Sequence, residues 1–121
     1  MSIKGIVITA DNDISVQEFE EPLYKSAGAV IGADLVEHVR PPRLPSPYCM
    51  YVDEEGVIKG LPINSTAGWL CGHIIVGTVI IFKDGIAADG EPDTISLEDE
   101  DIEELVPALD EIAQFCEGCG E

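Results

Sequence analysis

The chain has 121 residues, enough for one domain that buries a hydrophobic core without a disulfide or a metal ion to hold it together. Its 24 acidic and 6 basic residues give a formal net charge of −18, which disfavours direct binding to nucleic acids or anionic membranes and favours cationic partners. No apolar run reaches the roughly 20 residues that span a bilayer, and no signal peptide is recognisable, so we expect a cytoplasmic protein with reduced cysteines.

The first part of the chain predicts a β-hairpin followed by a helix. Residues 3–9 and 14–19 have the apolar, β-branched composition of strands, and the polar residues between them favour a turn. The helix begins near Pro22, carries one apolar face and ends at Gly32. We expect this helix to lie on the sheet.

A third strand is expected at residues 33–39. His38 and Arg40 are two residues apart and therefore lie on one face of the chain. Together they could bind an anion, although a pair that faces solvent or an acidic neighbour is the more common arrangement. Four prolines within residues 41–47 then predict a stiff connector, with a Pro-x-x-Pro ligand motif as the alternative.

A second hairpin and a short helix are predicted next. Residues 48–52 and 57–61 are expected to pair across a glycine-containing turn. Asn64 or Ser65 can then cap a short helix, which ends at Gly72 because glycine readily adopts the left-handed conformation.

The predicted fold class is α+β, with a mixed, mainly antiparallel sheet and two helices packed on it. Its last strand is expected at residues 74–82, where nearly all residues are β-branched or large and apolar, as in a strand covered on both faces. We expect this core domain to occupy residues 1–83. An acidic Gly/Asp-rich linker at residues 84–95 and an acidic helical appendage at residues 96–121 would follow.

The predicted tail is strongly acidic but amphipathic. Residues 1–83 hold 10 acidic and all 6 basic residues, whereas residues 84–121 hold 14 acidic residues and no basic one. A capping-box-like pattern opens a helix at Ser96, and Pro107 is expected to divide it into two short helices. The apolar stripe of the tail is expected to pack on the protein's own sheet, with another protein as the alternative. The stripe consists of Ile102, Leu105, Val106, Leu109, Ile112, Ala113 and Cys116.

Part of the core resembles a known family. The resemblance rests on the sequence YVDEEGVIKGLPIN at residues 51–64, on the short helix after it and on the step IVG at residues 75–77. These segments are similar to the small family called domain of unknown function 3846, over roughly residues 3–83. Its members occur in phages, plasmid-like elements and gut and soil bacteria. The resemblance therefore implies a mobile-element context inside a bacterial host cell, without a reaction or catalytic residues.

The cysteines near the end of the chain form the one metal-like pattern in the sequence. Cys116 and Cys119 are separated by two residues, a spacing at which both thiolates can reach one tetrahedral zinc ion. Cys71 and His73 could complete such a site, and Cys49 is a further candidate. Small buried cysteines and a frayed chain end explain the same pattern, so we expect no bound zinc and no other cofactor.

The sequence carries no recognisable catalytic motif, so we expect a protein that is not an enzyme. The first functional hypothesis is a phage or mobile-element counter-defence inhibitor that mimics nucleic acid. It would occupy the basic channel of a host nuclease, or of a restriction or CRISPR component. The partner-binding acids would be Glu98, Asp99, Glu100, Asp101, Glu103 and Glu104.

Two alternatives remain open at this point. A small-molecule-binding protein could sequester a nucleotide signal, although the acidity of the chain argues against this. The phosphates of the nucleotide would contact His38, Arg40, Arg43 or Lys59, and the base would stack on Trp69 or on a tyrosine. A structural module could instead form homo-oligomers through the apolar stripe of the tail.

Overall fold

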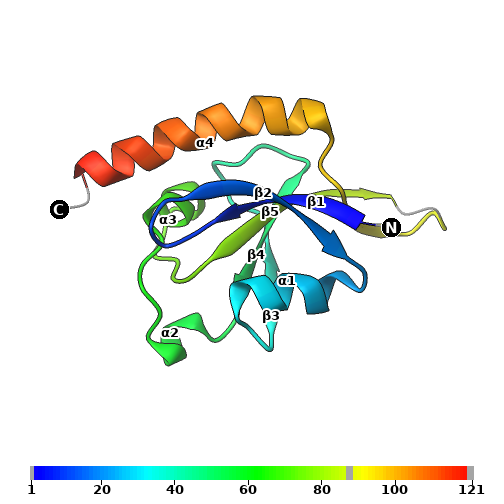
Figure 1. Cartoon of the computed structure of the whole chain (residues 1–121), viewed down its shortest axis with the longest axis horizontal. Helices are drawn as coiled ribbons and strands as arrows, with labels where there is room; N and C mark the ends of the chain where they lie inside the picture. The colour runs from blue at the N-terminus through cyan, green and yellow to red at the C-terminus, as the bar shows by residue number, and fades with distance from the viewer. Residues whose placement is uncertain (1, 87–88, 120–121) are drawn as a thin grey trace.

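A six-stranded antiparallel sheet forms the centre of the protein in the computed structural model, which describes residues 2–86 and 89–119 (Figure 1). The side chains of Pro92 and of residues 117–119 lie outside this description. The strands are β1 (Ser2–Ile8), β2 (Ile14–Glu20), β3 (Val36–Val39), β4 (Tyr48–Asp53), β5 (Val79–Ile86) and β6 (Pro92–Ile95). Their order is β2-β1-β5-β4-β3, and β6 pairs with the end of β5.

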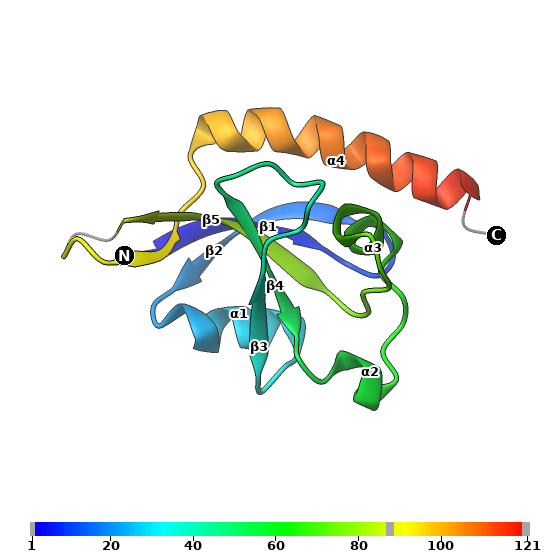
Figure 2. The ribbon, with the colours of Figure 1, turned by 180° about the vertical axis from the view of Figure 1, so that it is seen from behind.

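Helices cover both faces of the sheet, which confirms the α+β class. The helices are α1 (Leu23–Ile31), α2 (Gly56–Lys59), α3 (Ser65–Cys71) and α4 (Asp99–Cys119). Figures 1 and 2 show α1 on one side of the sheet and α4 on the other. Successive side chains of the central strands serve the two layers in turn. Ile6 and Ile81 belong to the core under α3 and α4, whereas Val7 and Ile80 belong to the core under α1.

The N-terminal hairpin and the first helix agree with the sequence analysis. β1 and β2 pair along their whole length, from Ser2 opposite Glu20 to Ile8 opposite Ile14. α1 follows Pro22 directly. It ends at Gly32, whose φ of 81° lies in the left-handed region. Local signals were sufficient here because both ends of the helix are marked by residues with strong backbone preferences.

The predicted strand at residues 57–61 is wrong, because this segment contains α2. The carboxylate of Asp53 accepts hydrogen bonds from the Glu55 N–H at 2.8 Å and from Lys59 Nζ at 2.9 Å, which closes the turn into a helix. Val57 and Ile58 are 78% and 86% exposed, so these β-branched residues do not mark a buried strand. The apolar residues at 57–61 therefore do not indicate a segment of the core.

The predicted strand at residues 74–82 begins late, since β5 starts at Val79. The preceding residues form a loop that wraps around the fully buried Asn64 side chain. Asn64 Nδ2 donates to the carbonyls of Ile8 at 3.0 Å and Gly77 at 2.8 Å, and Asn64 Oδ1 accepts the Ala67 N–H at 3.0 Å. Asn64 is therefore the cap of α3, and it also fixes the loop to β1.

The linker predicted at residues 84–95 and the core boundary at Lys83 are also wrong. β5 continues to Ile86, and β6 returns along it, with Lys83 opposite Ile95. The Leu97 side chain behind β6 is 1% exposed and belongs to the main core. Gly and Asp residues in this segment suggested a linker, but Asp84, Gly85 and Asp93 belong to paired strands.

The tail forms one helix, α4, which runs through Pro107. Proline has no N–H for the carbonyl of Glu103, but Pro107 is exposed and water can solvate that carbonyl. Leu105 and Leu109, on either side of the proline, are buried against the sheet, so the stripe packs on its own core as expected. In the described part of the chain, no helix is both long and apolar enough to cross a membrane.

Candidate functional site

The first turn of α4 is fixed to the sheet by Asp101. Its carboxylate accepts hydrogen bonds from Lys83 Nζ at 2.8 Å, from the Tyr48 hydroxyl at 2.7 Å and from the Glu98 N–H at 2.8 Å. Burial alone would raise the pKa of Asp101, but these hydrogen bonds and the charge of Lys83 lower it to about 2. Asp101 was predicted to bind a partner. It faces the core and holds α4 in place instead.

A second acid of the predicted set is also paired. Asp99 Oδ1 lies 3.0 Å from Lys4 Nζ, although this pair is exposed and contributes little to stability. The other four predicted acids are exposed and have no ion pair among the described residues. They are Glu98, Glu100, Glu103 and Glu104, and two further exposed acids follow on the helix, Asp110 and Glu111.

The unpaired acids on α4 give its outer surface a high charge density, in two groups on either side of residues 105–109. Glu98 precedes the helix, and from Glu100 to Glu111 the helix rises by about 16 Å, so the five acids on it provide on average about one charge per 3 Å. A single DNA strand carries one phosphate per about 3.4 Å along its axis. We call Glu100, Glu103, Glu104, Asp110 and Glu111 the α4 acidic face.

An apolar hollow adjoins the α4 acidic face. It has a volume of about 390 Å³ and is lined by Trp69, Ala108, Glu111, Ile112 and Phe115. The Trp69 side chain is 38% exposed and the Phe115 side chain is 60% exposed. The helical spacing from Glu100 through Glu104 and Glu111 to Phe115 places the acids and the hollow along one flank of α4.

The predicted nucleotide-binding residues lie in separate places. Arg43 stacks over Trp69, with 4.7 Å from its guanidinium carbon to the ring centroid, and donates to the Trp69 carbonyl at 2.9 Å. Lys59 on α2 is held by Asp53 and by the Gly32 carbonyl. Neither residue shares a described contact with His38 or Arg40, so these cations do not form one phosphate site.

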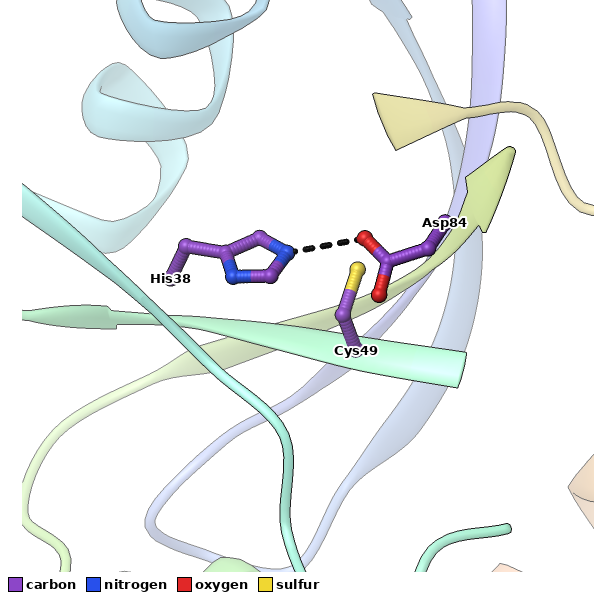
Figure 3. A group of neighbouring side chains, drawn as sticks. All are labelled: His38, Cys49 and Asp84. Atoms are coloured by element: carbon purple, nitrogen blue, oxygen red, sulfur yellow. Dashed lines mark hydrogen bonds and ion pairs between the residues drawn. The ribbon is translucent and has the colours of Figure 1, made fainter. Parts of the chain in front are cut away.

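A second polar cluster lies on the α1 face of the sheet, where β3, β4 and β5 each contribute one residue. His38, Cys49 and Asp84 point toward one another (Figure 3). His38 Nε2 lies 3.0 Å from Asp84 Oδ1, and Arg40 Nε donates to Asp84 Oδ2 at 2.7 Å. One ligand atom from each of His38, Cys49 and Asp84 lies within 4.8 Å of the others. The predicted anion pair therefore holds a carboxylate of its own chain.

The electrostatics of this cluster argue against a cysteine nucleophile. Burial, reinforced by the negative charge of Asp84, raises the pKa of the Cys49 thiol to about 12, and the side chain is fully buried. Burial would also raise the pKa of Asp84, but the hydrogen bonds from Arg40 and His38 lower it. The thiol is consequently neutral at physiological pH, and only a thiolate is a good nucleophile.

A small cavity opens beside the cluster. It measures about 230 Å³, and its lining includes His38, Arg40, Asp84, Asp93 and Thr94. The Thr94 hydroxyl lies 2.8 Å from the Tyr51 hydroxyl on the same face of the sheet. A small ligand could therefore approach the cluster from solvent.

Three of the predicted zinc ligands, Cys71, His73 and Cys116, do not form a metal-binding group among the described side chains. Cys71 and Cys116 are buried, His73 is exposed, and the Cys119 side chain lies outside the described residues. Among the described side chains, the group that could share one metal ion is His38, Cys49 and Asp84. The sequence analysis missed this group because Asp84 was assigned to a linker. If the strand predicted at residues 74–82 is extended by two residues, Asp84 lies on the same face as Phe82. Phe82 is the residue that pairs with Cys49 on β4.

The sequence of residues 3–110 matches the family described as a domain of unknown function (DUF3846). The chain belongs to the DUF3846 family. This confirms the resemblance found in the sequence, and the match also covers β6 and the first half of α4. The DUF3846 domain therefore extends beyond the boundary expected at Lys83.

Comparison with other proteins adds a fold but no activity for this DUF3846 protein. A solved structure described as the crystal structure of small RNA methyltransferase HEN1 superposes with a TM-score of 0.61 at 13% sequence identity. The matched region covers 84% of this chain and only 15% of that one. At such low identity the similarity shows a shared fold alone. A comparison with the sequences of curated proteins finds no match.

Proposed function

We propose that this DUF3846 protein is a non-enzymatic inhibitor that binds the basic surface of a nucleic-acid-handling protein. The α4 acidic face would occupy that surface in place of nucleic acid. In a phage or mobile element, the natural target would be a host nuclease, or a restriction or CRISPR component, in the bacterial cytoplasm.

The density of unpaired carboxylates on α4 carries this proposal. Five acids without described ion pairs lie along one helix, at a mean density close to that of phosphates along a DNA strand. Acids that serve only to keep a protein soluble need not lie along an ordered helix. A basic channel that accepts a nucleic-acid backbone offers complementary charge to this helix.

The attachment of α4 to the core strengthens the proposal. Buried Leu105 and Leu109 and the hydrogen bonds of Asp101 hold the helix on the sheet before any partner arrives. A surface that is already ordered loses less conformational entropy on binding than a disordered acidic tail would. A rigid acidic helix is therefore better suited to competition with nucleic acid than a flexible one.

The apolar hollow beside Glu111 supplies an anchor for the partner. Exposed Trp69 and Phe115 are aromatic residues, which are enriched at protein interfaces. An arginine or lysine of the partner could place its aliphatic stem in the hollow and its charge against Glu111. This combination favours a basic protein over a small anionic ligand.

Both alternative functions have less support. His38 and Arg40 already bind the Asp84 carboxylate, so a nucleotide phosphate would have to displace it within an acidic protein. The apolar stripe proposed for oligomerisation is used inside the molecule, where Leu105 and Leu109 are buried.

Affinity capture from bacterial lysate with a charge-matched control tests the proposal. The first variant replaces four unpaired acids of α4 by glutamine, at Glu100, Glu103, Glu104 and Glu111. The control variant makes the same change in charge at exposed acids elsewhere, at Glu20, Glu21, Glu37 and Glu54. We expect the wild type and the control to retain a nucleic-acid-binding protein that the α4 variant loses. Equal retention by both variants would contradict the proposal, as would captured proteins that do not bind nucleic acid.

A further inference from the structure

We propose that His38, Cys49 and Asp84 bind one zinc ion through the imidazole Nε2, the thiolate Sγ and a carboxylate oxygen. The site is distinct from the C-terminal cysteine pattern and from the α4 acidic face. It lies on the opposite face of the sheet from α4, where the three side chains converge (Figure 3).

The donor set and its dimensions fit zinc. Thiolate, imidazole and carboxylate are the ligands that zinc prefers, at bond lengths of about 2.0–2.3 Å. In a tetrahedral site these bond lengths place the donor atoms about 3.3–3.8 Å apart. The three donors lie within 4.8 Å of one another, and the His38 Nε2 to Asp84 Oδ1 distance is 3.0 Å. Changes of up to about 1 Å in the distances between these donor atoms therefore create the site.

The surrounding structure lets the His38 side chain move and holds Cys49 and Asp84 in place. Cys49 and Asp84 lie on the paired strands β4 and β5. His38 lies on the edge strand β3, and its side chain is 32% exposed, so the imidazole can adjust. The two inner ligands are therefore positioned in advance by the sheet.

Arg40 provides the support that a carboxylate ligand usually has. Its Nε donates to Asp84 Oδ2 and leaves Oδ1 directed at His38. Metal-binding carboxylates are typically hydrogen-bonded through the oxygen that does not face the metal, and such contacts orient the ligand. The arginine side chain is 70% exposed, so it can move away from the cation while the hydrogen bond adjusts.

Three protein ligands leave the fourth position of the zinc ion open. The cavity of about 230 Å³ adjoins His38 and Asp84, so this position would face a space that water or a small oxygen ligand can enter. Binding forms a zinc–sulfur bond and breaks the S–H bond of Cys49, and the proton leaves to solvent. Without metal, His38 Nε2 and Asp84 Oδ1 form a hydrogen bond with each other.

The chain offers matched controls for a direct test, because it contains two histidines and several buried cysteines. Protein stripped with a chelator would be titrated with zinc against a chromophoric chelator, and separately with cobalt(II) as a spectroscopic probe. His38→Gln would be compared with His73→Gln, and Cys49→Ala with Cys71→Ala. The exposed His38 can be changed without a packing defect, whereas Cys49→Ala requires a check of the fold by circular dichroism.

We expect one equivalent of zinc and a cobalt spectrum with a thiolate charge-transfer band and strong visible bands of tetrahedral geometry. His38→Gln should weaken zinc binding by at least about 100-fold, because loss of a group that only orients a metal ligand already costs about 10–100-fold. Cys49→Ala should remove the charge-transfer band, and both controls should bind like the wild type. The absence of zinc binding would overturn the proposal. Binding that survives His38→Gln but is lost in His73→Gln would also overturn it, and would locate the metal at the pattern of Cys71 and His73 predicted from the sequence.

Discussion

Lys83 Nζ donates a 2.8 Å hydrogen bond to Asp101 Oδ2, and this contact joins β5 to the first turn of α4. Both side chains are largely shielded from solvent, at 18% and 15% exposed. The sequence suggested that Lys83 ends a core and that Asp101 belongs to a separate acidic tail. Their contact makes the core and the helix one folding unit.

Asp101→Asn should therefore destabilise the whole protein. The substitution keeps the shape of the side chain but removes the charge that pairs with Lys83, which should lower the free energy of unfolding by about 2 kcal/mol. Urea denaturation followed by circular dichroism measures this difference. Asp110→Asn, at an exposed position of the same helix, should change it by less than about 0.5 kcal/mol. Equal stability of the two variants would show that the Lys83–Asp101 pair does not hold α4.

The contribution of Asp101 should disappear in acid. Its pKa is about 2 in the folded protein, below the value of about 3.9 for aspartate in an unfolded chain. A depressed folded-state pKa stabilises the protein above the unfolded pKa, and this stabilisation is lost as the pH falls through the folded pKa. The difference in unfolding free energy between wild type and Asp101→Asn should be constant above about pH 5 and shrink between about pH 4 and pH 2. A difference that does not change across this range would contradict the assignment.

Leu109 should be as important for stability as a residue of the sheet. It is 1% exposed and packs in the core that Ile6, Ile8 and Ile81 line from the sheet. Leu109→Ala should cost about 3 kcal/mol of unfolding free energy, as is typical for a buried leucine. Phe115→Ala on the same helix should cost less than about 1 kcal/mol, because Phe115 is 60% exposed.

Truncation tests whether the sheet can fold without β6 and α4. A chain that ends at Lys83 lacks part of β5, all of β6, Leu97 and α4, and it exposes the core that these elements cover. We expect it to lack a cooperative thermal transition. A cooperative melt of residues 1–83 would restore the boundary that the sequence suggested.

Asn64→Ala should be among the most damaging single substitutions. The side chain caps α3 and donates to the carbonyls of Ile8 and Gly77, and it is fully buried. Loss of the cap and of both hydrogen bonds should lower the unfolding free energy by at least about 3 kcal/mol. Ser65→Ala is the control, because the alternative cap predicted from the sequence makes no described side-chain hydrogen bond. Chemical denaturation measures both losses of unfolding free energy. A larger loss for Ser65→Ala would show that Ser65, and not Asn64, caps α3.

Local signals explain which elements were predictable from the sequence. Pro22 and Gly32 mark the ends of α1, and Gly72 ends α3 with a φ of 78°, because these residues impose a backbone conformation wherever they occur. Residues 57–61 and 84–95 could not be assigned in this way. Their structure depends on the side-chain hydrogen bonds that Asp53 makes to Glu55 and Lys59 and on the pairing of β6 with β5, which the composition of these segments does not indicate.

The same distinction applies to the candidate sites. The acidic character of the tail was visible in the composition, but no local pattern distinguishes paired Asp101 from exposed Glu100 and Glu104. The cluster of His38 and Asp84 with Cys49 depends on the register of three strands, and a local pattern carries no register.

Displacement by nucleic acid tests the proposed function most directly. A partner captured on the immobilised protein would be challenged with duplex DNA at several salt concentrations, starting near physiological ionic strength, where charges are screened over about 8 Å. If the α4 acidic face occupies a nucleic-acid-binding surface, DNA should release the partner, and binding should weaken steeply as salt rises. The variant neutralised at Glu100, Glu103, Glu104 and Glu111 should associate more slowly than the charge-matched control. A partner that stays bound in saturating DNA, or that binds both variants at the same rate, would contradict the proposal.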